Sequence, residues 1–339
     1  MVHEMLTDTQ MFIPNLLDNW PWPRQLNPYH AISKSESDSW AQSFNAFDSE
    51  AQHVYNKCNF SLLGSLAFPT VDKNGCRIVC DLMHLFFVFD EYSDVASASV
   101  VQSQADSIMD AMRNPTHPRP QGESILGEMA RQFWENVIRS TTPTFQHRFI
   151  AAFQEYTDAV VQQALDRDHH NIRKINQYLE IRRDTIGIKP SLTILESQFN
   201  LPDEVMRHPS LIALQSACVD MVAICNDLVS YNNEQARGDE EHNLVTIVMR
   251  EHKCSLTDAF TWISSLNDNV ADTFLSVLKT VPSFGDRTID EQVAFYIDGL
   301  RNWVRGNDTW SFESGRYFGV KGLEIQKKRM VDLLPRRQA

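Results

Sequence analysis

The stretch LFFVFDEYSD, residues 85–94, brings five apolar residues directly up to a cluster of acids. Asp90 and Glu91 come first, and Asp94 follows one helical turn after Asp90. Residues four apart share a helix face, so Asp90 and Asp94 point in the same direction. Neighbouring carboxylates repel one another, and an apolar environment disfavours their charge. The pair therefore predicts a bound cation, and Mg²⁺ suits it because Mg²⁺ takes oxygen ligands and keeps several waters. The alternative is a solvated helix end.

A second set of oxygen atoms lies in NDLVSYNNE, where Asn226, Ser230 and Glu234 are spaced four and four. At about 100° per residue, each step of four drifts by only about 40°, so the three side chains form a stripe on one helix face. An amide, a hydroxyl and a carboxylate together make a set of hard ligands for one Mg²⁺. The alternative is an ordinary polar helix face.

Basic residues that suit phosphate follow in two places. The segment YLEIRRDTIGIKP carries Arg182 and Arg183 followed by Gly187, and ESGRYFG carries Arg316 and Tyr317. Arginine offers a planar fork of donors that matches phosphate oxygens, and tyrosine adds one more donor. Beside two oxygen-rich metal motifs, these residues predict a diphosphate site, although each taken alone is typical of a protein surface.

The elements that position these residues are expected to be helices. Residues 144–186 and 239–281 contain neither Pro nor Gly, and apolar residues recur at intervals of three and four over residues 211–225 and 257–279. Strand-like alternation is scarce. We therefore expect an all-α fold of roughly ten or more helices in one domain over residues 1–339, with an irregular segment, residues 1–30, covering the domain.

Composition limits the partners. The chain carries 31 Lys and Arg against 44 Asp and Glu, a net charge of −13, which argues against nucleic acid and against stable association with anionic membranes. Six cysteines without a CxxC pair indicate reduced thiols. No basic, apolar leader opens the sequence, so we expect a cytoplasmic protein. The oligomeric state is not predicted.

Taken together, the motifs resemble those of class I terpene cyclases. DEYSD is similar to their D(D/E)xxD motif, NDLVSYNNE to their NDxxSxxxE motif, RRDTIG to the segment with a diphosphate-sensing Arg and a helix break, and RY to their C-terminal pair. The resemblance implies a single-domain helical bundle with a central active-site cavity. By motif spacing it implies that Arg183 is the sensor and Gly187 the break.

The same resemblance implies the chemistry. Asp90, Asp94, Asn226, Ser230 and Glu234 would hold three Mg²⁺ ions, which Mn²⁺ can replace, and the substrate would be farnesyl diphosphate. Arg183, Gly187, Arg316 and Tyr317 would bind its diphosphate. Phe86 and Phe87 stand one turn before the acids, where their π faces can stabilise a carbocation. Trp303 and Trp310 are further wall candidates.

The overall likeness is to fungal sesquiterpene synthases, and most of all to the protoilludene synthase group. That group implies closure of an eleven-membered ring to a humulyl cation and further closures to protoilludene. The chain departs from the family pattern at two positions. Glu91 replaces the second acid, which leaves its metal contact open, and Asn233 stands where many relatives carry Lys or Arg. Open alternatives are a different ring closure and a binding protein without turnover. A chain-elongating prenyltransferase would be expected to carry a second Asp-rich motif, and NDLVSYNNE stands in its place.

Overall fold

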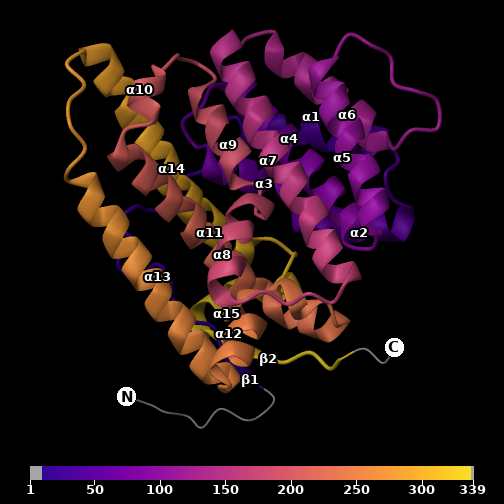
Figure 1. The fold of residues 1–339 in the computed structure, drawn as a ribbon, viewed down its shortest axis with the longest axis vertical. Helices are drawn as coiled ribbons and strands as arrows, with labels where there is room; N and C mark the ends of the chain where they lie inside the picture. The colour runs from indigo at the N-terminus through magenta and orange to yellow at the C-terminus, as the bar shows by residue number, and fades with distance from the viewer. Residues whose placement is uncertain (1–9, 337–339) are drawn as a thin grey trace.

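The computed structural model describes residues 10–336, and the sequence-based expectation for residues 1–9 lies outside this range. The regular secondary structure of the described chain is helical, as expected, except for one short pair of strands (Figure 1). The first seven helices are α1 (His30–Ser43), α2 (Ser49–Cys58), α3 (Phe60–Ala67), α4 (Lys73–Ser93), α5 (Ala98–Arg113), α6 (Ile125–Ile138) and α7 (Pro143–Asp168).

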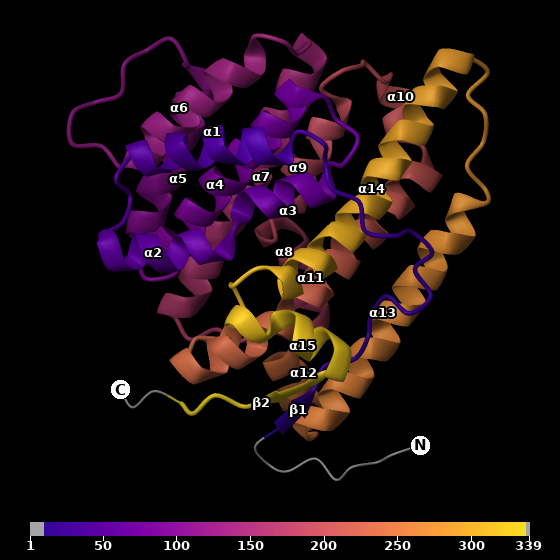
Figure 2. The same cartoon turned by 180° about the vertical axis from the view of Figure 1, so that it is seen from behind.

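The second half of the chain completes the bundle. It comprises α8 (Ile175–Thr185), α9 (Ile188–Thr193), η1 (Ile194–Glu196), α10 (Asp203–Met206), α11 (Pro209–Arg237), η2 (Glu240–His242), α12 (Leu244–His252), α13 (Leu256–Leu278), α14 (Arg287–Glu313), η3 (Gly319–Lys321) and α15 (Gly322–Lys328). The strands β1 (Gln10–Phe12) and β2 (Met330–Asp332) pair antiparallel and join the two ends of the described chain (Figure 2).

Local signals set the ends of the helices that carry the site. Asp72 caps α4 by accepting a hydrogen bond from the backbone N–H of Gly75. A proline in the first turn starts α11, and Gly238, with φ of 83°, ends it in the left-handed region that favours glycine. The metal-ligand candidates therefore lie at the C-terminal ends of two long apolar helices.

The helix α11 runs through the centre of the molecule (Figure 1). It is long and apolar enough to cross a membrane, but 67% of its most apolar window is buried inside the protein. It packs on α13 and α14, while α3 packs on both α4 and α14. Its hydrophobic face therefore belongs to the core of the bundle. The irregular segment before α1 also packs on this core through Leu17 and Trp20, which are 6% and 5% exposed.

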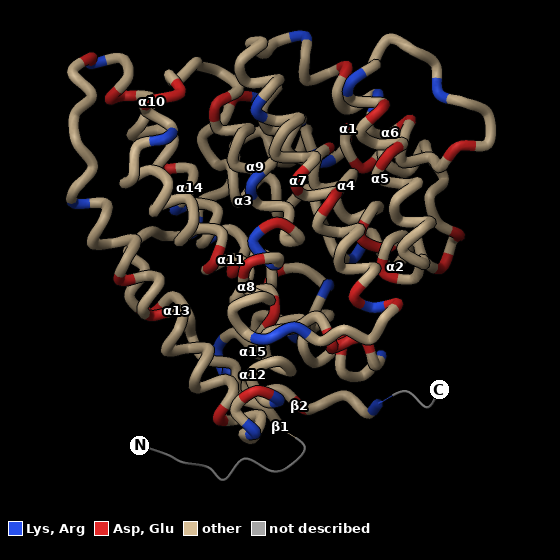
Figure 3. Tube along the Cα trace, viewed as in Figure 1, with Lys and Arg blue, Asp and Glu red and all other residues tan. Residues whose placement is uncertain are grey.

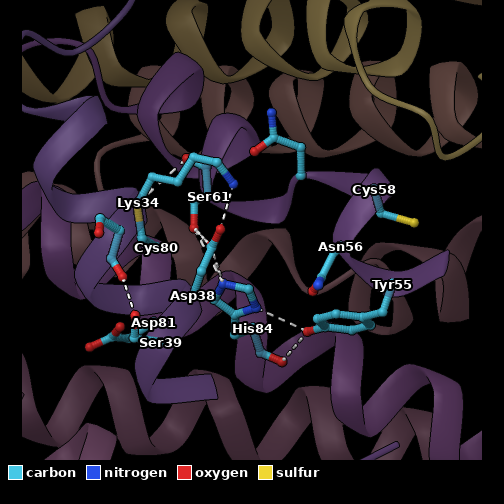
Figure 4. Close-up of polar contacts among 12 residues, drawn as sticks. Lys34, Asp38, Ser39, Tyr55, Asn56, Cys58, Ser61, Cys80, Asp81 and His84 are labelled. Carbon is cyan, nitrogen blue, oxygen red and sulfur yellow. Dashed lines mark hydrogen bonds and ion pairs between the residues drawn. The ribbon is translucent and has the colours of Figure 1, made fainter. Parts of the chain in front are cut away.

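A largely buried polar network, here called the Asp38 network, joins α1, α2 and α3 to the middle of α4 (Figure 4). Asp38 accepts hydrogen bonds from the Ser61 hydroxyl at 2.7 Å and from His84 Nε2 at 3.0 Å. On the other edge of the imidazole, Nδ1 lies 3.1 Å from the Tyr55 hydroxyl. Lys34 forms an ion pair with the second oxygen of Asp38. These contacts fix the rotation of α4 against its neighbours.

Candidate active site

The structure gathers the predicted motifs around one cavity of about 850 Å³, which α4, α8, α9, α11 and α14 surround. Asp90 and Asp94 line it from the end of α4, and Asp94 is the residue that follows the last helical turn. Loss of hydration raises the pKa of both carboxyls, and repulsion from Asp90 raises the pKa of Asp94 further. No Lys or Arg among residues 10–336 forms an ion pair with Asp94, whereas Asp90 has Arg316 at 3.4 Å, so the charge of Asp94 lacks a direct partner.

The stripe on α11 faces the same cavity, with Asn226, Ser230 and Glu234 all in its wall. Asn243, from the start of α12, donates a hydrogen bond of 2.8 Å to Glu234 and lies 3.4 Å from the Ser230 hydroxyl. Burial nevertheless raises the pKa of Glu234 to about 7. The two oxygen-rich motifs are therefore brought together, and Asn243 orients part of the second one.

Arg183 is not where the resemblance placed it. Its side chain is 42% exposed and forms an ion pair with Asp220 at 2.6 Å, and it is absent from the cavity wall. Arg182 lines the cavity instead, with only 12% of its side chain exposed. The two residues are about 100° apart on α8, so the packing of α8 against α11 turns one inward and the other outward.

Arg182 is held firmly by α11. Its guanidinium donates to Asn226 Oδ1 at 2.6 Å and to Asp227 at 3.0 Å. Asp227, which is 2% exposed, also accepts a hydrogen bond of 2.6 Å from the Tyr178 hydroxyl. Basic and acidic residues therefore occur close together where α8 lies against α11, as the blue and red segments of the tube show (Figure 3). Sequence reasoning did not assign Asp227, Tyr178 or Asn243 to the site, and the early signal was that Asp227 is the second defined position of the NDxxSxxxE pattern.

The C-terminal pair closes the other side of the cavity from the loop after α14. Arg316 forms ion pairs with Glu91 and, at 3.4 Å, with Asp90. The Tyr317 hydroxyl accepts a hydrogen bond of 2.8 Å from the Asn226 amide. This pair therefore connects the two oxygen-rich motifs, and Glu91 faces a guanidinium in this structure.

A helix break lies at Gly187, between the end of α8 and the start of α9. Its φ is 71°, and a Cβ built on it would come within 3.5 Å of the Phe86 ring. Glycine is favoured here by its backbone conformation, while a Cβ would make only ordinary contact with the ring. Gly187 itself lines the cavity.

Aromatic rings form the apolar part of the wall. Phe86 stacks on Phe153 at 5.4 Å between ring centroids. Phe87 stacks on Phe60 at 3.8 Å and lies 5.6 Å from Trp310. Phe86, Phe87, Trp303 and Trp310 all line the cavity. The rings are fixed by packing, so they offer stationary π faces to a ligand.

The donor set fits a divalent cation that is shared with a ligand. Carboxylates, an amide and a hydroxyl are hard oxygen ligands, and Asp94, which has no ion pair among the described residues, favours a positive partner. Among residues 10–336, no three acidic, His or Cys side chains are gathered closely enough to hold an ion by themselves. Magnesium sites commonly combine one or two carboxylates with substrate phosphates, and this arrangement matches that pattern.

Comparison with known proteins decides the family. Residues 81–272 match the family model described as terpene synthase family 2, C-terminal metal binding. The chain belongs to the fungal class I sesquiterpene synthases. It is 49% identical over 97% of its length to Delta(6)-protoilludene synthase of Stereum hirsutum, of which it covers 89%. It is 50% identical over 96% of its length to the Armillaria gallica enzyme of the same name, of which it covers 94%.

Solved structures support the fold of this terpene synthase. A crystal structure of α-eudesmol synthase superposes with a TM-score of 0.79 at 19% identity, covering 88% of this chain and 99% of the other. A variant of cucumene synthase gives a TM-score of 0.77 at 21% identity, covering 87% of this chain and all of the other. The sesquiterpene synthase is thus a terpene cyclase that acts on an isoprenoid diphosphate and depends on divalent metal.

Proposed function

We propose that this enzyme ionises farnesyl diphosphate with Mg²⁺ and cyclises it through a humulyl cation to protoilludene. The observation that carries the proposal is the meeting of two oxygen-rich motifs and an aromatic wall in one cavity. The product follows from relatives that are 46–50% identical to this chain and are named Delta(6)-protoilludene synthases. Three ions, and replacement of Mg²⁺ by Mn²⁺, remain part of the proposal.

The metal-ligand roles belong to Asp90, Asp94, Asn226, Ser230 and Glu234. Bound there, Mg²⁺ would supply positive charge that stabilises the departing diphosphate. Arg182, in place of Arg183, together with Arg316 and Tyr317, would donate to the diphosphate oxygens. These donors are preorganised by their contacts with α4 and α11, so little reorganisation is needed when charge develops on the leaving group.

The aromatic wall has a separate task. Once the C–O bond breaks, the allylic cation lies against π faces that attract positive charge and do not react as nucleophiles. Phe86, Phe87 and Trp310 are held by neighbouring rings. The cavity also has to exclude water, because water would quench the cation to an alcohol. The folded shape of the bound chain then decides which double bond attacks.

The test is incubation of the purified full chain with farnesyl diphosphate, followed by gas chromatography and mass spectrometry. We expect a tricyclic hydrocarbon matching protoilludene with Mg²⁺ or Mn²⁺, and no turnover in excess EDTA. Products of ten-membered or six-membered closure alone would overturn the product assignment but leave the family intact. Undiminished turnover in EDTA would overturn the proposed metal chemistry. A cytoplasmic location remains a proposal, which fractionation of the producing cells tests.

A further inference from the structure

The last turn of α11 carries one more residue on the ligand stripe. Arg237 follows Asn226 by eleven residues and Ser230 by seven, so at about 100° per residue it lies within about 20° of each around the helix axis. It lines the same cavity as the stripe. Arg237 is therefore directed towards the site.

The stripe contains no cation at position 233, where the family pattern commonly has one. The Asn233 amide donates instead to the backbone carbonyls of Arg316 and Tyr317, at 3.4 and 3.3 Å. Asn233 thus holds the C-terminal pair in place and brings no charge. Arg237 lies one turn further along the same helix, where a long side chain can supply the missing positive charge.

The other arginines in the cavity wall are engaged with the protein. Arg167 donates to the backbone carbonyls of Ser93 and Ala96, and Arg173 pairs with Asp166. Arg182 and Arg316 are held as described above.

Arg237, in contrast, is 42% exposed, and its ion pair with Asp239, at 3.2 Å, lies at the surface. Surface ion pairs contribute only about 0–1 kcal/mol, so the guanidinium of Arg237 can leave Asp239 at small cost.

We propose that Arg237 is a diphosphate-binding residue of this enzyme, which replaces the basic side chain that position 233 lacks. The proposal rests on the proposed function, because it requires an isoprenoid diphosphate in the cavity. A guanidinium can bind two phosphate oxygens at once, and such charge-assisted hydrogen bonds are the stronger class. The competing role is purely structural, because a basic residue in the last turn of a helix stabilises the helix dipole.

The experiment measures binding of inorganic diphosphate in saturating MgCl₂ by isothermal titration calorimetry, with no turnover involved. Arg237→Gln should weaken binding about tenfold or more, the scale of one lost charge-assisted contact. Arg237→Lys should recover most of the affinity, since it restores the charge. The matched control is Arg207→Gln, which removes an exposed arginine paired with Asp203 outside the cavity wall, and it should bind like wild type.

A second set of variants tests whether a positive charge at position 233 can replace that of Arg237. Asn233→Lys in the Arg237→Gln background should regain affinity, and Arg237→Gln alone should raise KM for farnesyl diphosphate more than it lowers kcat. Wild-type affinity in Arg237→Gln, with only a lower melting temperature, would overturn the inference and support the helix-dipole role. In that case the proposed function stands if wild type still converts farnesyl diphosphate. Failure of wild type to bind Mg²⁺ and diphosphate would overturn both.

Discussion

Two clusters of ionisable side chains lie at different places along α4, one around His84 and the other around Asp90 and Asp94, and they differ in how their charges are satisfied. In the Asp38 network, burial opposes ionisation of Asp38, but hydrogen bonds from His84, Lys34 and Ser61 outweigh it and hold the pKa well below its usual range. In the cavity, burial and repulsion from Asp90 together raise the pKa of Asp94. The charge of Asp38 is therefore balanced by its neighbours in the protein. The charge of Asp94 is balanced only when cations bind in the cavity.

The difference separates structural from functional polarity. A buried polar group with all its hydrogen-bond and ion-pair partners stabilises the fold. A group whose pKa is strongly shifted and that lacks such partners indicates a ligand-binding site. The Asp38 network contacts α4 through His84, and its Tyr55 packs against Phe60, the ring on which Phe87 stacks. Substitutions in the network should therefore reduce stability, while substitutions in the cavity should reduce or redirect catalysis.

The largest expected effect comes from Glu234→Gln. The amide keeps the size of the side chain and an oxygen for the Asn243 hydrogen bond, but it removes a charged metal ligand. We expect turnover of farnesyl diphosphate to fall by at least about 100-fold. Folding raises the pKa of Glu234 to about 7, above its unfolded value of about 4.3. Ionised Glu234 therefore destabilises the folded protein, and this destabilisation grows as pH rises from about 4.3 to above 7.

The stability of the same variant provides the second half of that test. In EDTA at pH 8, Glu234→Gln should melt at a temperature equal to or higher than that of wild type, because it no longer buries an unpaired charge. Differential scanning calorimetry measures this. A marked drop in melting temperature would place Glu234 in the structural class with Asp38 and erase the contrast between the two clusters.

Asp38→Ala should have the opposite effect. It leaves His84 Nε2 and the Ser61 hydroxyl without their acceptor, so the free energy of unfolding should fall by about 1–3 kcal/mol. Urea denaturation followed by circular dichroism measures the loss. Below the melting range, kcat should stay within about threefold of wild type. A large loss of turnover in a fully folded variant would show that the network takes part in catalysis.

Phe87→Ala tests the connection between the two clusters. Removing the ring that stacks on Phe60 enlarges the cavity beside the acids without touching a metal-ligand candidate. We expect diphosphate release to continue at a rate within about tenfold of wild type, while the hydrocarbon mixture broadens towards earlier-quenched or less cyclised compounds. Gas chromatography gives the profile. An unchanged profile would mean that Phe87 serves only core packing.

The smallest expected effect is a difference in acid stability. The pKa of Asp38 in the folded protein lies below its unfolded value of about 3.9. Ionised Asp38 therefore contributes fully to the free energy of unfolding above about pH 3.9, and this contribution is lost as pH falls further. Between pH 5 and pH 3, wild type should lose more stability than Asp38→Asn, by about 1 kcal/mol or less. Parallel melting curves of the two proteins across this range would show instead that other acids dominate.

The sequence alone determined the helical class and the location of both oxygen-rich motifs. This was possible because each motif lies within a single helix, where a spacing of four residues sets the shared face whatever the helix packs against. The resemblance also implied the break at Gly187, where glycine suits the positive φ of the backbone. Local chemistry was enough for these features.

Contacts between helices were decided only by the tertiary structure. Which of Arg182 and Arg183 faces the cavity depends on the rotation of α8 against α11, which the RR pair does not encode. The contact of Asn243 with Glu234 joins the start of one helix to the end of another, and Phe87 meets Phe60 across two helices. Such pairings arise from the packing of whole side-chain surfaces, so spacing along one helix carries no information about them.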